Sequence, residues 1–198
     1  MTTTKTAFDE ARRDANWLER VDLDVAEAAE PWGDHPLVEA IGKASDLADQ
    51  PPLLAASLVT LGVGLAGGDR RLARTGGRML AAFALATAVK TLVKDHVDRP
   101  RPEKVAREGE HEVEPGDSED GEERSLPSGH SAGAFAVARA VAREYPSASV
   151  PAHLVAGSAA LVQIPRKAHF PTDVLLGTLI GIGAEAVVGA ILPAQQRD

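Results

Sequence analysis

Five segments of this chain are almost free of charged residues, and they restrict most strongly what it can fold into. They are residues 52–68, 79–93, 129–142, 152–164 and 174–192. Alanine, leucine, valine and glycine dominate them, and no turn-bounded alternation of apolar and polar residues is present, so helices are expected rather than strands. Because the first and last segments lack a polar face, insertion into a membrane is favoured. A soluble bundle, or an oligomer that buries these faces, is the alternative.

Charged residues gather in two other parts of the chain. Residues 1–50 contain 5 basic and 12 acidic side chains, and residues 103–124 contain 3 and 10. We therefore divide the chain into an acidic N-terminal segment, residues 1–50, and a helical-bundle domain, residues 51–198, with an acidic loop at 103–124. The acidic segments argue against binding to nucleic acid. The absence of cysteine excludes disulfides and cysteine-based metal sites.

The spacing of apolar residues in the N-terminal segment predicts further helices. One amphipathic helix is expected over residues 8–30, with an apolar face formed by Phe8, Ala11, Ala15, Leu18, Val21 and Val25. A short helix should follow at about residues 36–48. The predicted fold class is therefore all-α: an up-and-down bundle of five apolar helices plus an N-terminal amphipathic helix, embedded in a membrane. The acidic loop should be disordered and solvated, or should lie as a lid over a cationic pocket.

Three polar clusters lie where the apolar segments begin or end. They occupy residues 94–102, 126–131 and 166–173. In an up-and-down bundle, consecutive helices run in opposite directions, so these three clusters fall at the same end of the molecule. The sequence therefore predicts that residues far apart in the chain meet in one pocket.

The first two clusters provide groups that bind an oxyanion. Lys94, Arg99 and Arg101 supply positive charge, and the planar fork of an arginine matches the oxygens of a phosphate. Ser128 and Gly129 open a helix, where free backbone N–H groups and the positive end of the helix dipole attract an anion. These residues predict a phosphate site.

Two histidines and a carboxylate provide groups for proton transfer and attack. His130 stands beside the expected anion site, where it can donate a proton. His169 and Asp173 are four residues apart at the start of the last apolar helix. The carboxylate can therefore fix one ring nitrogen of the imidazole and leave the other nitrogen free to attack.

The order of these motifs resembles the type 2 phosphatidic acid phosphatase superfamily, which also contains bacterial acid phosphatases and vanadium haloperoxidases. The matching motifs are Lys94-x6-Arg101-Pro102, Pro127-Ser128-Gly129-His130 and His169-x3-Asp173, and the resemblance covers about residues 52–192. It implies that His169 is the nucleophile that forms a phosphohistidine, that Asp173 orients it, and that His130 protonates the leaving group. It also implies that Lys94, Arg101, Ser128 and Gly129 hold the phosphate oxygens, with no metal or other cofactor.

One position departs from the pattern of this superfamily. The family usually has an arginine six residues before the nucleophilic histidine, and here that residue is Gln163. Either Arg166 reaches the phosphate from one helical turn away, or the phosphate is held by one cation fewer. We include Arg166 in the predicted phosphate site.

From this resemblance we expect a multi-pass membrane phosphatase that removes the terminal phosphate from a lipid phosphate or an isoprenyl pyrophosphate. The alternatives are a soluble acid phosphatase or vanadate-dependent peroxidase of the same superfamily, and a weakly active lipid-phosphate binder, which Gln163 favours. The expected location is a bacterial-type inner membrane with the active site facing outward. The basis for this orientation is the positive charge between the first two apolar segments, at Arg70, Arg71, Arg74 and Arg78.

Overall fold

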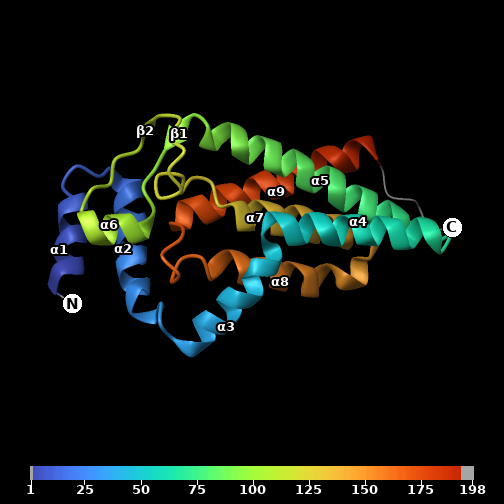
Figure 1. Ribbon diagram of the computed structural model, residues 1–198, viewed down its shortest axis with the longest axis horizontal. Coiled ribbons are helices and arrows are strands. Elements are labelled where there is room, and N and C mark those ends of the chain that lie inside the picture. Colours follow the sequence, from blue (N-terminus) through green and yellow to red (C-terminus); the bar gives the residue numbers. More distant parts are fainter. Residues whose placement is uncertain (1, 193–198) are drawn as a thin grey trace.

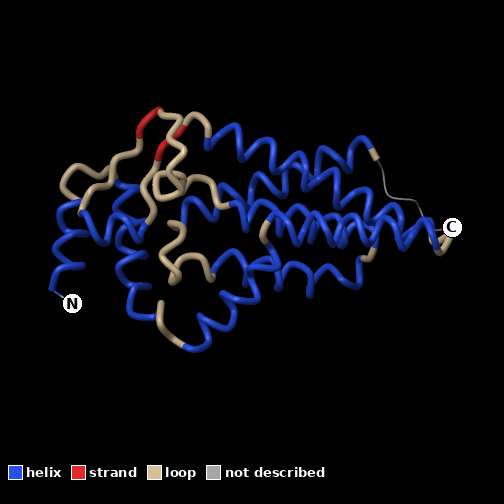
Figure 2. Tube along the Cα trace, viewed as in Figure 1, coloured by secondary structure: helices blue, strands red, loops and turns tan. Residues whose placement is uncertain are grey.

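The computed structural model describes residues 2–192, and the last part of the predicted bundle domain, residues 193–198, lies outside the described residues. The helices are α1 (Thr2–Ala11), α2 (Trp17–Ala29), α3 (Pro36–Ser45), α4 (Gln50–Ala66), α5 (Arg70–Lys94), α6 (Pro102–Glu108), α7 (Gly129–Glu144), α8 (Ser149–Leu161) and α9 (Pro171–Ile191). Short 3-10 turns follow α2, α3 and α7, and a small antiparallel ladder joins β1 (Val97–Asp98) to β2 (Glu114–Pro115). Figure 2 shows that helix dominates the described chain, as the predicted all-α class requires.

The five apolar segments form the predicted up-and-down bundle of α4, α5, α7, α8 and α9 (Figure 1). Helix α7 packs against α5, α8 and α9, and α4 packs against α5. Small residues allow close approach: a Cβ atom at Gly64 would overlap the backbone of Ala73, and one at Gly181 would overlap the backbone of Ala132. Alanine side chains fill much of the space between α5, α7 and α9. The bundle is therefore held by tight contacts between helix backbones.

The outer surface of the bundle is apolar. Helices α5 and α9 are long and apolar enough to cross a membrane, and α4 is a shorter apolar helix. Large apolar side chains that are more than half exposed lie on α4, α5, α8 and α9: Val59, Val63, Leu65, Leu92, Val150, Leu154, Val155, Leu161, Leu175, Leu179, Val187 and Ile191. Contiguous exposed apolar surface of this kind is typical of contact with a membrane or a partner. It supports a membrane-type helical fold.

The single N-terminal helix predicted over residues 8–30 is wrong, because the chain divides it into α1 and α2. Asn16 begins α2: its side-chain oxygen accepts hydrogen bonds from the N–H groups of Leu18 and Glu19, and the Glu19 carboxylate accepts one from the N–H of Asn16. The break changes which face of α2 is buried. The predicted apolar residues Leu18, Val21 and Val25 are exposed, whereas Asp22 is 1% exposed.

Helices α1, α2 and α6 lie beyond one end of the bundle, on the left of Figure 1. This is the end at which α5 finishes and at which α7 and α9 begin. The N-terminal residues share a small apolar core with α6 and with the residue before α9, formed by Phe8, Ala11, Ala15, Leu23, Ala26, Val105 and Phe170. The N-terminal segment is therefore anchored beside the predicted site.

The acidic loop expected at residues 103–124 contains α6 and β2, and it packs against the chain around it. The N–H of Arg99 donates to the carbonyl of Glu123 at 2.6 Å, and the N–H of Arg101 donates to the carbonyl of Glu122 at 2.8 Å. The side chain of Lys104 is paired with the carboxylate of Glu123. The expectation of a disordered loop is therefore wrong: backbone pairing and these charge pairs hold a sequence with so few apolar residues in a defined conformation.

One arginine used to predict the orientation is not at the surface. The structure begins α5 at Arg70, so Arg78 lies inside the bundle, 1% exposed. Its Nη2 atom is 3.3 Å from a carboxylate oxygen of Glu144, and its Nη1 atom is 3.5 Å from one of Glu185. Only Arg70, Arg71 and Arg74, at the start of α5, therefore remain as evidence for the orientation of the bundle in a membrane.

Candidate active site

The three polar clusters meet at the end of the bundle where the N-terminal segment packs. Lys94 is the last residue of α5, Ser128 is the N-cap of α7, and Asp173 lies in the first turn of α9. A backbone hydrogen bond joins the second cluster to the third: the N–H of Ser128 donates to the carbonyl of Asp173 at 3.0 Å. Gly177 allows this contact, because a Cβ atom there would overlap the carbonyl of Ser128.

The carboxylate of Asp173 is fully buried and is fixed by several donors. Its Oδ1 accepts a hydrogen bond from Nη1 of Arg99 at 2.6 Å. Its Oδ2 accepts from the hydroxyl of Ser125 at 2.6 Å and from the N–H of Phe170 at 2.7 Å. A carboxylate held from both sides in this way keeps one orientation toward its remaining neighbour, His169.

His169 is 4% exposed and faces this carboxylate. Its Nδ1 atom lies 3.7 Å from Oδ2 of Asp173, which is an ion-pair distance and too long for a hydrogen bond. Burial lowers the pKa of His169, the charge of Asp173 opposes this shift, and the positive charges of Lys94 and Arg101 lower the pKa further. The imidazole is therefore neutral near neutral pH and keeps a lone pair for attack.

Positive charge and unpaired polar atoms surround the two histidines. Lys94 and Arg101 are half-buried, and the Nζ of Lys94 donates to the carbonyl of Arg124. Arg101 also lies within electrostatic range of His130. The Nε of Arg101 and the Nε2 of His130 are buried with no hydrogen-bond partner among residues 2–192. Buried groups that lack partners in a cationic region are suited to a bound anion.

The start of α7 adds backbone donors to the same region. The hydroxyl of Ser128 is buried and accepts hydrogen bonds from the N–H and the hydroxyl of Ser131, at 3.4 and 3.0 Å. This serine therefore acts as the helix cap, while the N–H groups of Gly129 and His130 belong to the first turn, whose amides have no partner within the helix. A Cβ atom at Gly129 would lie 3.3 Å from Nζ of Lys90, which places another cation beside these amides.

Comparison with known proteins identifies the family. A family model described as the PAP2 superfamily matches residues 75–197. This chain belongs to the PAP2 superfamily. A comparison with curated proteins finds no significant match.

The fold of this PAP2 protein is also similar to that of a solved structure. That structure is described as the crystal structure of the first transmembrane PAP2 type phosphatidylglycerolphosphate phosphatase from Bacillus subtilis, with a TM-score of 0.65 and 21% sequence identity. The similarity covers 96% of each chain, so it includes the N-terminal segment as well as the bundle.

Gln163, which stands where the superfamily usually has an arginine, is held by buried contacts. Gln163 is 2% exposed, and its Nε2 donates to the hydroxyl of Ser45 at 3.1 Å and to the carbonyl of Ala159 at 3.0 Å. The Nη1 of Arg166 donates to the carbonyl of Gly42 at 3.0 Å and to the hydroxyl of Ser45 at 3.1 Å. The structure therefore turns Arg166 toward α3, at the edge of the site and within electrostatic range of His130.

The sequence predicts that Arg99 binds phosphate with the other cations of the first cluster, but the structure gives Arg99 a different role. Its guanidinium is 4% exposed and lies between two carboxylates, with Nη2 at 2.6 Å from Oδ2 of Asp22 and Nη1 at 2.6 Å from Oδ1 of Asp173. Lys94 and Arg101, rather than Arg99, are the cations of that cluster whose charges act on His169.

Three residues that contact Asp173 or its partner Arg99 were not predicted from the sequence: Asp22, Ser125 and Thr172. Ser125 stands two residues before the Pro-Ser-Gly-His motif, and Thr172 stands between His169 and Asp173. Their nearness to these motifs is a signal that could have identified them. Asp22 has no such signal, because it lies in a segment where acidic residues are frequent.

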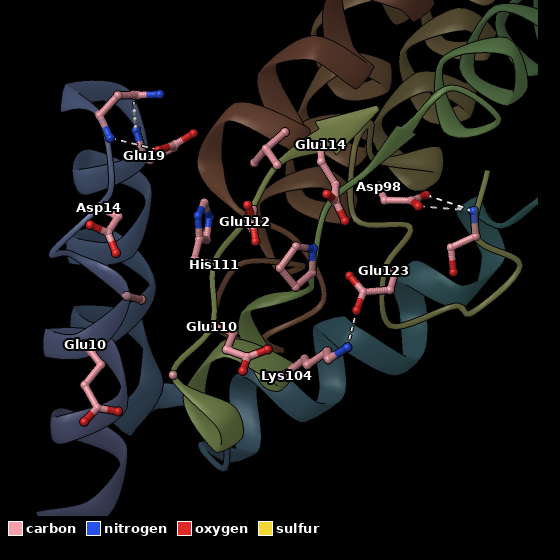
Figure 3. A pocket seen from close by; sticks show the side chains of 16 residues that line it. Glu10, Asp14, Glu19, Asp98, Lys104, Glu110, His111, Glu112, Glu114 and Glu123 are labelled. Atoms are coloured by element: carbon pink, nitrogen blue, oxygen red, sulfur yellow. Dashed lines mark hydrogen bonds and ion pairs between the residues drawn. The ribbon is translucent and has the colours of Figure 1, made fainter. Parts of the chain in front are cut away.

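Two cavities, neither of which is lined by His130 or His169, differ in their chemistry. One of about 890 Å³ lies between α1 and the segment 98–123, and Figure 3 shows that acidic side chains surround it. A phosphate would be repelled there by carboxylates that include Glu10, Glu19, Asp98, Glu112 and Glu114. The other is an apolar groove of about 770 Å³ between α3, α7 and α8, and its lining includes Ser45 and Ala159, the two partners of Gln163.

Proposed function

We propose that this PAP2 protein is a membrane phosphatase that hydrolyses the terminal phosphate of a lipid phosphate or lipid pyrophosphate through a phosphohistidine. The observation that carries the proposal is the pairing of a buried, neutral His169 with a fixed carboxylate beside Lys94, Arg101 and the start of α7. Membership of the superfamily supports a phosphatase.

The first step forms a bond between nitrogen and phosphorus. Nε2 of His169, the ring nitrogen turned away from Asp173, attacks the phosphorus atom, and the bond from phosphorus to the leaving oxygen breaks. His130, which enters this step as the imidazolium, donates a proton to that oxygen and becomes neutral, so the alcohol or lipid phosphate leaves with one negative charge fewer. The carboxylate of Asp173 stabilises the positive charge that develops on the imidazole of His169.

The second step regenerates the enzyme. His130, now neutral, accepts a proton from a water molecule whose oxygen attacks the phosphohistidine, and the bond between nitrogen and phosphorus breaks to release inorganic phosphate. In both steps, Lys94, Arg101 and the N–H groups at Gly129 and His130 face the negative charge on the phosphate oxygens. No residue needs a metal ion in this sequence of events.

The apolar surroundings support a substrate with a hydrocarbon tail. The apolar groove between α3, α7 and α8 is lined in part by Ser45 and Ala159, the two partners of Gln163. A groove with this lining suits a hydrocarbon chain. The Bacillus subtilis protein is described as a phosphatidylglycerolphosphate phosphatase, which supports a lipid phosphate of this class. We propose a location in a bacterial-type inner membrane, with Arg70, Arg71 and Arg74 at the cytoplasmic end and the active site facing outward.

The test is the release of inorganic phosphate from lipid substrates in detergent micelles. The substrates are phosphatidate, phosphatidylglycerophosphate and undecaprenyl pyrophosphate. We expect the parent to hydrolyse at least one of them and His169→Ala to lose this activity. The matched control is His153→Ala, because His153 lies on α8, where its Nδ1 contacts the carbonyl of Ser149 and its ring faces that of Phe135. Absence of release from every substrate, or equal activity in parent and His169→Ala, would contradict the proposal.

A second candidate is a protein that binds lipid phosphate without turnover. It is favoured by the contacts of Gln163 and Arg166 with α3, which leave the phosphate with fewer cations than the superfamily pattern provides. Removing one charge-stabilising donor typically slows a reaction by about 10²–10³-fold. Saturable binding of vanadate by a protein that releases no phosphate would favour this candidate over the enzyme.

A further inference from the structure

Three buried side chains connect the N-terminal segment to the proposed nucleophile. Arg99 donates from Nη2 to Oδ2 of Asp22 and from Nη1 to Oδ1 of Asp173, both at 2.6 Å. Asp22 is 1% exposed, Arg99 is 4% exposed and Asp173 is 0% exposed. One guanidinium therefore bridges a carboxylate on α2 and a carboxylate on α9, away from solvent.

Other contacts fix this bridge in place. The N–H of Thr172 donates to Oδ1 of Asp22 at 3.0 Å, and the hydroxyl of Thr172 lies between Oδ2 of Asp22 and Nη1 of Arg99. The guanidinium carbon of Arg99 stands 4.5 Å from the centre of the Phe170 ring. Phe170 in turn belongs to the same apolar core as Leu23, the neighbour of Asp22 on α2. The position of α2 is thus tied to the residues that directly follow His169.

The charges of the bridge also decide how much negative charge remains for the imidazole. Asp22 and Asp173 together carry two negative charges, and Arg99 carries one positive charge. Because Asp22 offsets the charge of Arg99, the carboxylate of Asp173 keeps its own charge available to His169. Without Asp22, Arg99 would neutralise Asp173 in a region buried from bulk solvent, where the interaction is strong.

We propose that Asp22 is a positioning residue for the nucleophile: it holds and neutralises Arg99, so that Asp173 keeps both its orientation and its charge toward Nδ1 of His169. This inference rests on the proposed function, because it assigns to α2 a part in the same reaction. It gives the acidic N-terminal segment a role in catalysis that its sequence pattern does not reveal.

The first test compares Asp22→Asn with Asp24→Asn, a change of the same charge on the same helix. Asp24 is exposed and pairs with Arg12 at the surface. We expect Asp22→Asn to lower kcat by about 10–100-fold, the range found when a residue that orients a reactive group is lost, with KM changed less than about twofold. Equal kcat values in the two variants would overturn the inference.

The pH profile separates positioning from a general structural effect. The charged groups that act on His169 are Asp173 on α9, Lys94 on α5 and Arg101 before α6. When Asp22 is neutral, Arg99 competes for the charge of Asp173, so protonation of His169 becomes harder. We expect the acid limb of the kcat profile to move to lower pH in Asp22→Asn and to stay in place in Asp24→Asn. A limb that does not move would contradict the inference.

A double variant tests whether Asp22 acts through Asp173. We expect Asp22→Asn combined with Asp173→Asn to be no slower than Asp173→Asn alone, because the second change removes the group that Asp22 positions. Additive losses would show that Asp22 acts by another route and would overturn the inference.

Thr172→Val provides a milder change if Asp22→Asn does not fold. It removes the hydroxyl between Asp22 and Arg99 but leaves every charge in place. We expect kcat to fall by about threefold, with thermal unfolding close to that of the parent. A parent-like kcat in this variant would count against the inference.

Failure of the inference can be distinguished from failure of the proposed function. If the parent releases no phosphate from any lipid, the proposed function fails, and the pKa of His169 can still be measured by nitrogen-15 NMR of labelled histidine. The inference expects this pKa to be lower in Asp22→Asn than in Asp24→Asn. Equal values would overturn it, whereas an active parent with unequal values would support both.

Discussion

At the scale of single residues, the reactivity of His169 depends on opposing effects on its protonation. Burial and the positive charges of Lys94 and Arg101 lower the pKa of His169, and the carboxylate of Asp173 opposes them. The net shift is downward from the ordinary histidine value of about 6.5. The ring is therefore harder to protonate than that of an exposed histidine, which favours the form that can attack.

This balance leads to a prediction for the pH dependence of kcat/KM. We expect the acid limb of the parent to lie below about pH 6.5, because His169 is inactivated only when it is protonated. Lys94→Gln removes a positive charge that opposes protonation, so the limb should move to higher pH as the overall rate falls. Phosphate release measured across the acid range checks this, and a limb that moves to lower pH in Lys94→Gln would contradict it.

The same scale shows what the sequence could reveal about the site. Lys94, Ser128 and His169 lie beside recognisable motifs at helix ends, so alternation of the helices was enough to bring them together. The bridge from Asp22 through Arg99 could not be predicted in this way. These residues are 77 positions apart, and Asp22 stands among acidic residues that are mostly exposed. Only the packing of α2 distinguishes it from them.

At the scale of secondary-structure elements, the site depends on the close contact of α9 with the start of α7. A Cβ atom at Gly177 would overlap the carbonyl of Ser128 and would lie 3.0 Å from Cβ of Ser131. We therefore expect Gly177→Ala to separate the two helices, with a loss of about 1–3 kcal/mol of stability and a lower kcat. Thermal unfolding and phosphate release measure the two effects.

Gly183→Ala is the matched control for this change, since it is on the same helix and a Cβ atom there would meet nothing within 4 Å. Alanine is favoured over glycine in a helix by about 1 kcal/mol, so this variant should be at least as stable as the parent. Equal unfolding temperatures for Gly177→Ala and Gly183→Ala would contradict the account of the contact between α7 and α9.

The division of the N-terminal helix is also an effect at this scale, and it was predictable in part. Asn16 followed three residues later by Glu19 is a capping-box pattern, which marks the start of a helix. The regular spacing of apolar residues over 8–30 hid this signal. Because the break places Asp22 on the buried face of α2, the choice between one helix and two decides whether α2 can reach the site.

A pair of variants tests the cap. We expect Asn16→Ala to lower the free energy of unfolding by about 1 kcal/mol, because two N–H groups of α2 lose their acceptor. Asn16→Asp should retain the stability of the parent, since aspartate caps helices as well as asparagine does. Chemical unfolding of the two variants checks this, and equal stability of Asn16→Ala and the parent would contradict the role of the cap.

At the scale of the whole molecule, an apolar bundle carries a polar site and an acidic N-terminal lobe at one end. Side chains such as Val59, Leu154 and Leu179 are exposed on the bundle, where water would be unfavourable. We expect the protein to be monodisperse in detergent or lipid and to aggregate when these are removed. Size-exclusion chromatography with and without detergent measures this. A monodisperse, detergent-free protein would favour the soluble alternative.

The most direct test of the central claim is to trap the phosphorylated enzyme. When a reaction with phosphorus-32-labelled lipid phosphate is quenched in alkali, under which phosphohistidine persists, we expect label on the peptide that contains His169. The label should be absent in His169→Ala and retained in His153→Ala. Turnover by the parent with no trapped label, or label on a peptide that lacks His169, would contradict the claim that this histidine is the nucleophile.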